Sequence, residues 1–221
     1  MTEHVRVAVI GGGIVGCSVL FALAERGWTD TLLLERRELT SGSTWHAAGN
    51  TTFFGHYVSI TRLYVESVAA YLRAEDESGQ AISFHAAGSL RLATTPAELD
   101  AYRSLEPMYQ AMGVPYHVIG PTEIEAVHPL LNTAGLFGAA HTPTDGHVDS
   151  SGATHALAQA ARKRGAKIKR QCPVETIAPH KEGWRLGTPE GEVIAEHIVL
   201  ANSFWAREMA EQIGLNLPLY S

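Results

Sequence analysis

The feature that most constrains the fold is an apolar run, Val5 to Ile10, that leads directly into the glycines Gly11, Gly13 and Gly16. A stretch with helical character, Ile14 to Arg26, follows at once. This order is typical of a parallel strand that feeds a helix through a tight turn, where the first glycine adopts unusual dihedral angles. The second glycine lets a pyrophosphate approach the backbone, and the third lets helix and strand pack closely. The helix N-terminus then offers free N–H groups to the anion.

A second apolar run, Thr31 to Leu34, ends on Glu35. An acid about twenty residues after such a turn accepts a hydrogen bond from a ribose hydroxyl and would repel a 2′-phosphate, which disfavours NADP. Strand, helix, second strand and acid together predict a dinucleotide-binding domain, but they leave NAD and FAD open.

A loop of small residues follows, SGSTWHAAG from Ser41 to Gly49. Its hydroxyls and glycines could wrap a phosphate and a ribityl chain, whereas a histidine such as His46 is by itself ordinary in a loop. The part from Ser43 to Gly49, STWHAAG, resembles a motif of the dimethylglycine and sarcosine dehydrogenases, which are D-amino-acid-oxidase-like flavoproteins. The similarity extends over essentially the whole chain and includes the segments Gly88–Thr95, Asp145–Asp149 and Phe204–Glu208. One departure lies before the Phe-Trp-Ala block, where the family usually has Asn-Ala-Ala-Gly and this chain has Leu200-Ala201-Asn202-Ser203.

The resemblance implies that FAD is the cofactor and that His46 is bonded covalently to its 8α carbon. It also implies that Glu35 holds the adenosine ribose with Arg36 beside it, and that the backbone of Val174 meets the adenine ring. We expect a neutral imidazole, favoured by the apolar side chains of Trp45, Ala47 and Ala48. The cofactor-binding residues expected in this way are Gly11, Gly13, Ile14, Val15, Gly16, Glu35, Arg36, Gly42, Ser43, Thr44, His46, Ala47, Ala48, Gly49, Asn50, Val174 and Ala206.

The predicted fold class is α/β, with an FAD-binding Rossmann-like parallel sheet of the glutathione-reductase type and a mixed α+β insertion. Residues 1–50 and 148–221 are assigned to the FAD-binding fold, and residues 51–147 to an inserted part of the substrate domain. In the first helix we expect Val15, Val19, Ala22 and Leu23 to form the apolar face.

Capping boxes are predicted in the insertion at Thr95–Glu98 and Thr122–Glu125, and Pro107 should break or kink the helix that the first box opens. Asp149 should cap a helix over 150–164 with Gly165 after its end. A strand over 167–171, a meander over 173–178, 183–187 and 193–195, a separate strand over 197–201 and a helix over 204–213 complete the expected elements.

Relatives of this type continue beyond the position of Ser221, so we expect a C-terminally truncated chain whose catalytic residues lie beyond Ser221. The strand over 197–201 would then form an open edge. We expect weak or absent activity of this chain alone, unless a second chain completes the fold as a partner.

Composition excludes several classes of protein. Hydrophobic residues make up 45% of the chain and the formal net charge is −6, which gives no electrostatic case for nucleic acid or an anionic membrane. No apolar run approaches the roughly 18 residues that span a bilayer. The first strand begins so close to Met1 that we expect no leader and a cytoplasmic protein.

Cys17 and Cys172 form no pair that indicates a disulfide or zinc site. His141, Asp145, His147 and Asp149 match no metal-site spacing, so no metal is predicted.

The predicted function is FAD-dependent oxidation of an N-methyl amino acid of the dimethylglycine or sarcosine type, with hydride transfer from the N-methyl carbon to flavin N5. The substrate is a small-molecule amine, and the electrons pass to an acceptor protein or to oxygen. Two alternatives stay open: an NAD-dependent dehydrogenase, and a non-catalytic flavin-binding or regulatory homologue. A flavin absorption spectrum would distinguish the FAD enzyme from the NAD-dependent dehydrogenase. Turnover with bound FAD would distinguish it from the non-catalytic homologue.

Overall fold

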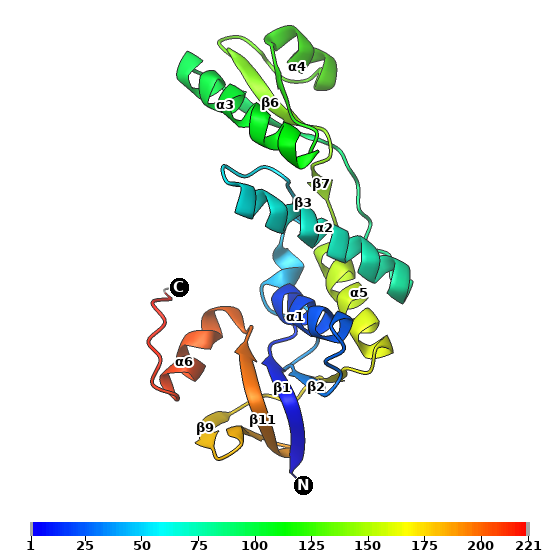
Figure 1. The fold of residues 1–221 in the computed structure, drawn as a ribbon, viewed down its shortest axis with the longest axis vertical. Helices are drawn as coiled ribbons and strands as arrows, with labels where there is room; N and C mark the ends of the chain where they lie inside the picture. Colours follow the sequence, from blue (N-terminus) through cyan, green and yellow to red (C-terminus); the bar gives the residue numbers. More distant parts are fainter. Residues whose placement is uncertain (1, 220–221) are drawn as a thin grey trace. The chain divides into compact units, whose positions relative to one another are not determined.

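The computed structural model describes residues 2–219, and they form two compact units (Figure 1). The first unit comprises Met1–Ala48, Tyr71–Ile82 and Asp149–Ser221, and the second comprises Gly49–Ala70 and Ser83–Val148. The predicted insertion over 51–147 differs from this division at Tyr71–Ile82. That segment stays with the first unit because its side chains bind helices there: Arg73 Nε lies 3.0 Å from Glu25 Oε1, and Arg164 Nε lies 2.7 Å from Glu77 Oε1.

The first unit is built on a six-stranded sheet with the order β8-β2-β1-β11-β10-β9. Its parallel half consists of β8 (Lys167–Lys169), β2 (Thr31–Leu34), β1 (Glu3–Ile10) and β11 (Gly191–Leu200). The strands β10 (Gly183–Thr188) and β9 (Thr176–His180) continue it in antiparallel pairing. The predicted α/β class is therefore confirmed, with a mixed rather than purely parallel sheet.

The strand β11 corrects two expectations. It is one continuous strand of 10 residues, whereas the sequence predicted two shorter ones, because the polar Glu196 and His197 interrupt its apolar pattern. Its pairing with β1 runs without a break from Glu3↔Val193 to Ile10↔Leu200. The prediction of an open edge at this strand is also wrong, since β11 lies between β1 and β10.

Three α-helices of the first unit are α1 (Ile14–Glu25), α5 (Ser150–Lys163) and α6 (Ala206–Glu211), and the short 3₁₀ turns are η1 (Thr44–His46) and η2 (Ser203–Trp205). The predicted cap of α5 is confirmed, because Asp149 accepts a hydrogen bond from the Ser151 N–H at 2.9 Å. The predicted apolar face of α1 is wrong. Val15 is 60% exposed, and Gly16, Cys17, Leu20, Phe21 and Ala24 are buried instead. Nearly every position of α1 is apolar, so periodicity cannot single out one face.

The second unit contains the sheet β4-β6-β5, formed by β4 (Ser89–Ala93), β6 (Gly138–Thr142) and β5 (His117–Ile119). A two-stranded ribbon joins β3 (Asn50–Thr51) to β7 (Gly146–His147). Its helices are α3 (Pro96–Met112), α4 (Pro121–Val127) and the first part of α2 (Val58–Ser78), which continues into the first unit.

The capping box at Thr95 is confirmed, because Thr95 Oγ1 accepts from the Glu98 N–H at 3.2 Å and Glu98 Oε2 accepts from the Thr95 N–H at 3.1 Å. The expected break at Pro107 is wrong, since α3 continues to Met112. Proline removes one helix hydrogen bond, and the buried Tyr109 beyond it, which stacks on Tyr116 at 4.2 Å, keeps the last turn in place.

The second predicted box is also misplaced. The helix α4 begins at Pro121, and the Gly120 N–H donates to Glu123 Oε2 at 2.8 Å. Only this half of a capping box is present, two residues before the Thr122–Glu125 position, because Gly120 has no side chain to supply the other half. Proline at the first helical position decides this start because its fixed φ suits the helix and its missing N–H would have had no partner there.

Asp145, in the segment considered for a metal, has its carboxylate engaged by protein groups. It accepts from the Phe53 N–H at 2.7 Å, from Thr52 Oγ1 at 2.9 Å and from Arg91 Nη1 at 3.3 Å. Only 2% of its surface is exposed, and Arg91 and these hydrogen bonds compensate its buried charge, so removal of one partner would leave that charge unpaired.

Candidate functional site

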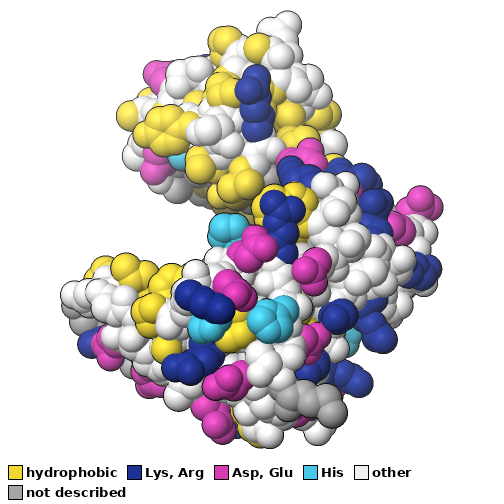
Figure 2. All heavy atoms as spheres, turned by 60° about the horizontal axis from the view of Figure 1, so that its bottom comes forward, with side chains coloured by type: hydrophobic (Ala, Val, Ile, Leu, Met, Phe, Trp, Pro, Cys, Tyr) yellow, Lys and Arg dark blue, Asp and Glu magenta, His cyan; other side chains and the backbone are white. Residues whose placement is uncertain are grey.

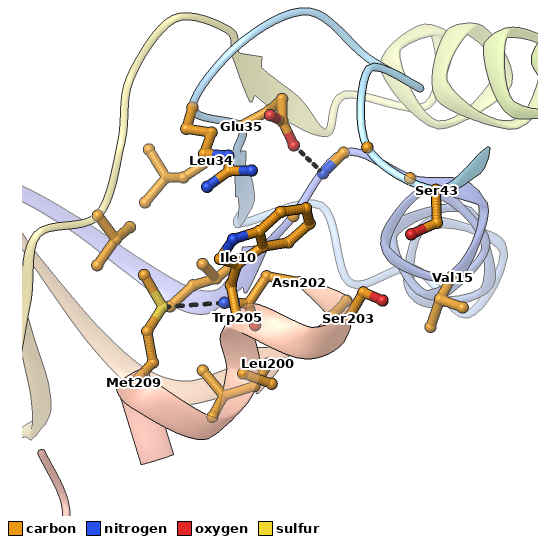
Figure 3. A pocket seen from close by; sticks show the side chains of 18 of the residues that line it. Ile10, Val15, Leu34, Glu35, Ser43, Leu200, Asn202, Ser203, Trp205 and Met209 are labelled. Atoms are coloured by element: carbon orange, nitrogen blue, oxygen red, sulfur yellow. Dashed lines mark hydrogen bonds between the residues drawn. The ribbon is translucent and has the colours of Figure 1, made fainter. Parts of the chain in front are cut away.

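A cavity of about 750 Å³ lies in the first unit at the C-terminal ends of β1, β2 and β11 (Figure 3). Its walls begin with the glycines that follow β1, with Glu35 and Arg36 after β2, and with Asn202 and Ser203 after β11. Ligands of parallel α/β sheets bind outside the carboxyl ends of the strands, so this is where a dinucleotide is expected.

Glycines make the turn after β1 possible. Gly11 has a φ of 115°, and a Cβ added there would lie 2.6 Å from the carbonyl oxygen of Ala201. A Cβ on Gly13 would lie 2.9 Å from Thr44 Oγ1, and one on Gly16 would lie 1.9 Å from the carbonyl oxygen of Gly11. Any side chain at these three positions would displace the turn. The predicted role of Gly16 in close packing fits this geometry, and Gly11 and Gly13 leave a backbone-lined cradle that suits a pyrophosphate.

Glu35 holds that turn in place. Its Oε2 accepts from the Gly12 N–H at 2.6 Å, as Figure 3 shows, and its Oε1 accepts from the Arg37 N–H at 2.8 Å. A carboxylate offers about four lone-pair sites. Each oxygen therefore keeps acceptor capacity for a sugar hydroxyl while it braces the glycine turn.

Thr44 joins the histidine-bearing loop to two helix N-termini. Its Oγ1 accepts from the Ile14 N–H at 3.0 Å, in the first turn of α1, and its carbonyl oxygen accepts from Ser150 Oγ at 2.9 Å, at the start of α5. The side chain is buried. Thr44 thus stabilises the loop, a role that sequence reasoning missed when it treated the residue only as a cofactor contact.

His46 lies in η1, outside the residues that line the cavity. Its ring stacks on Trp45 with centroids 3.8 Å apart, and its Nδ1 lies 3.3 Å from the carbonyl oxygen of Ser43. The apolar enclosure expected around the imidazole is not present, because Trp45, Ala47 and Ala48 are exposed along with His46.

Ser203, where the family resemblance predicted a glycine, has a φ of 54°. Left-handed backbone of this kind costs a non-glycine residue about 1–2 kcal/mol. The residue before it, Asn202, has a buried Oδ1 without a hydrogen-bond partner, and its Nδ2 donates to Met209 Sδ at 3.2 Å (Figure 3). The turn after β11 therefore keeps its shape at a local cost.

Most of the predicted cofactor residues line this one cavity: Gly11, Gly13, Ile14, Val15, Glu35, Arg36, Gly42, Ser43, Thr44, Ala47, Val174 and Ala206. Gly16, His46 and Ala48 do not line it, and Gly49 and Asn50 belong to the second unit. The sequence prediction missed Trp205, Met209 and Gln212, which come from η2 and the α6 region. An aromatic residue just after a buried strand was the available signal for Trp205.

The two cysteines are free thiols in the core. Burial, with a smaller contribution from the charge of Glu35, raises the pKa of Cys17 to about 12. A thiol with so high a pKa is not a nucleophile near neutral pH. The structural role predicted for Cys17 is consistent with this placement.

Charges of both signs are interspersed on the face drawn in Figure 2, and neither sign forms a broad patch there. Among residues 2–219, no helix is long and apolar enough to cross a membrane.

Comparison with known proteins matches residues 6–221 to the family described as DAO, FAD dependent oxidoreductase. Mitochondrial dimethylglycine dehydrogenase of Mus musculus is 41% identical over 218 residues, which are 98% of this chain and 25% of that protein. Mitochondrial sarcosine dehydrogenase of Homo sapiens is 34% identical over 97% of this chain and 24% of its own length. The crystal structure of L-proline dehydrogenase from P. horikoshii superposes with a TM-score of 0.88 at 28% identity, covering 100% of this chain and 58% of that one. This chain thus spans about a quarter of the length of these curated relatives.

Proposed function

We propose, from the premise that this chain belongs to the FAD dependent oxidoreductase family, that its first unit binds FAD in the cavity described above. The observation that supports this most directly is the turn of Gly11 and Gly13, which lines the cavity at the N-terminus of α1 and packs so closely on Ala201 and Thr44 that a Cβ at either position would displace it. Free N–H groups at a helix N-terminus favour a pyrophosphate. The family match favours FAD over the NAD alternative.

Each wall of the cavity would hold one part of the cofactor. Gly11 and Gly13 would take the pyrophosphate, Glu35 the adenosine ribose, and Val174 the adenine ring. Ser43 and Ala47 come from the loop that carries His46, so they would face the flavin end.

We propose further that His46 is the covalent attachment site. A carbonyl oxygen can only accept a hydrogen bond, so the contact between His46 Nδ1 and Ser43 requires the proton on Nδ1. The neutral ring then has its lone pair on Nε2, the nitrogen free to act as the nucleophile toward the 8α carbon. Exposure of the ring leaves that nitrogen accessible.

The proposed reaction is oxidation of an N-methyl amino acid such as dimethylglycine or sarcosine. Bound FAD would accept the hydride from the N-methyl carbon at its N5. The first unit would position and retain the cofactor, and the second unit would form part of the substrate domain. The electron acceptor, whether a protein or oxygen, and a second chain that completes the fold stay predictions, as does the cytoplasmic location.

The test is an absorption spectrum of the purified chain before and after acid precipitation. We expect flavin bands in the visible range that stay with the precipitated polypeptide, and loss of that retention in His46→Ala. A colourless protein that binds NADH and not FAD would overturn the cofactor assignment, and flavin released wholly into the supernatant would overturn the attachment.

Activity is measured separately, with dimethylglycine and sarcosine and an artificial electron acceptor. Turnover of either amine supports the proposed reaction. Bound flavin without turnover of either amine would not separate the proposed reaction from the non-catalytic, regulatory alternative, because this chain spans about a quarter of the length of its curated relatives.

A further inference from the structure

Two histidines of the second unit, His85 and His147, lie directly opposite each other. His147 belongs to β7, and His85 joins it through an isolated antiparallel bridge. The His85 N–H donates to the carbonyl oxygen of His147 at 2.9 Å, and the His147 N–H donates to the carbonyl oxygen of His85 at 3.1 Å. Directly opposite residues of an antiparallel pair have their side chains on the same face. The backbone therefore holds the two imidazoles side by side.

The spacing of the two rings suits one metal ion. Their centroids lie 5.3 Å apart, and their planes are tilted by 37°. A zinc–nitrogen bond of about 2.0–2.1 Å places the centroid of a bound imidazole about 3.2 Å from the metal. Two imidazoles on a tetrahedral zinc ion are then about 5.2 Å apart, centroid to centroid. Both side chains are exposed, so each ring is able to turn a nitrogen toward the ion without displacing the core.

The ring nitrogens of this pair have no other partner in residues 2–219, where no hydrogen bond or ion pair engages them. Neutral imidazole nitrogens are preferred ligands of Zn²⁺, Cu²⁺ and Ni²⁺. The carboxylate of Asp145, two residues before His147, is held by Phe53 and Arg91. Within the same described residues, no group of three or more His, Cys, Asp or Glu side chains is placed to hold a metal. An ion bound here would therefore keep open coordination positions.

We propose that His85 and His147 bind one Zn²⁺ ion through one ring nitrogen each, with water in the other two tetrahedral positions. The spacing of residues around His147 indicated no metal because its partner ligand comes from a distant segment of the chain. The ion would cross-link the segment of His85 to β7. This inference is independent of the proposed cofactor, since neither histidine lines the cavity of the first unit.

The experiment titrates the whole chain with zinc chloride by calorimetry and follows thermal unfolding with and without zinc. We expect a rise in Tm with zinc, because an ion that binds only the folded chain stabilises it. His85→Asn and His147→Asn should each weaken zinc binding by at least about tenfold, the lower end of what even an outer-shell change costs a metal site. Both variants should also lose the zinc-dependent rise in Tm. Binding should weaken in acid, because protons compete for the same nitrogens.

A matched control pair lies in the same unit. His117 and His141 are directly opposite each other on β5 and β6, but their ring centroids are 6.4 Å apart. A zinc ion between those rings would need a nitrogen–zinc–nitrogen angle of about 180°, which a tetrahedral site does not allow. His117→Asn and His141→Asn should therefore leave the zinc affinity and the zinc-dependent Tm unchanged.

Three results would overturn the site. One is an unsubstituted chain that does not bind zinc, and another is undiminished zinc binding in His85→Asn and His147→Asn. The third is an equal loss in all four histidine variants, which would mean unspecific binding to surface imidazoles. A loss confined to the His85 and His147 variants supports the proposal. The spectral test of FAD binding is unaffected by any of these results.

Discussion

Glu35 Oε2 and the backbone nitrogen of Gly12 lie 2.6 Å apart, so the acid at the end of β2 is hydrogen-bonded to the glycine turn at the end of β1. The residue that was expected to bind a sugar thus also fixes the backbone on which the pyrophosphate would rest. Under the proposed function, binding of both cofactor parts would depend on the Glu35 side chain.

Removing that carboxylate should therefore affect stability as well as affinity. Glu35→Ala is expected to lower the free energy of unfolding by about 1.5–3 kcal/mol, the usual contribution of a hydrogen bond to a charged group, and to weaken FAD binding. Urea unfolding measures the stability, and titration with FAD in a His46→Ala background, which carries no covalent flavin, measures the affinity. Glu38→Ala is the control, since Glu38 makes its ion pair with Arg170 on the surface. Unchanged stability in Glu35→Ala would contradict the bracing role.

Thr44→Val tests whether the Thr44 hydroxyl positions the loop that carries His46, apart from any contact of Thr44 with the cofactor. It removes the acceptor for the Ile14 N–H, and lost helix caps cost about 1 kcal/mol. We expect a lower free energy of unfolding and slower appearance of acid-stable flavin on the polypeptide. Thr44→Ser keeps the hydroxyl and should resemble the unsubstituted chain. Equal attachment rates in the valine and serine variants would show that the hydroxyl is not needed.

Ser203→Gly should stabilise the chain. Relief of the left-handed backbone at φ 54°, less the added entropy of an unfolded glycine, leaves a gain of roughly 0.5–1 kcal/mol. Ser43→Gly is the matched control, because Ser43 has a φ of −78° and should lose stability on the same exchange. Thermal unfolding of both variants measures the difference. A loss of stability in Ser203→Gly would mean that the serine hydroxyl makes a contact worth more than the strain.

Lowering the pH should reduce the free energy of unfolding through one identifiable group in the parallel half of the sheet, the Glu3 carboxylate. Burial acts to raise the pKa of Glu3, but hydrogen bonds and charge from Lys169 and Lys167 outweigh it and hold the pKa below its usual value. A depressed carboxyl pKa contributes stability that is present above the unfolded-state pKa of about 4.3 and is lost as pH falls through the folded-state pKa. Unfolding measured between pH 6 and pH 3 should show a smaller decline in Glu3→Gln than in the unsubstituted chain. Parallel declines would assign the acid sensitivity elsewhere.

Sequence alone predicted the turn, the strand–helix–strand order and the acid because each has a local physical signature: glycine spacing, apolar runs and a carboxylate at a fixed offset. Twelve of the seventeen residues that the family resemblance implied as cofactor contacts line one cavity, and their contact with a cofactor stays a prediction. The prediction from sequence failed where contacts between segments distant in the chain determine which residues are buried. The buried face of α1 could not be chosen from a sequence that is apolar all round, and the exposure of His46 depends on which segments pack over its loop. Trp205 was not predicted to line the cavity, because its contact with Arg36 joins segments that are far apart in the chain.

The central position of β11 sets an order of events during synthesis. Glu3 pairs with Val193, and the turn that packs on Gly11 is the direct continuation of that same strand. Ribosomes add roughly 5–20 residues per second, so the first strand waits on the order of ten seconds or more for its neighbour. Until β11 is in place, the glycine turn lacks the part of the cavity wall that follows this strand. Contacts between residues so distant in sequence form late. A nascent chain that has produced the glycines, the acid and the histidine loop still lacks the cavity wall that follows β11, so we expect it to hold no nucleotide until β11 enters the sheet.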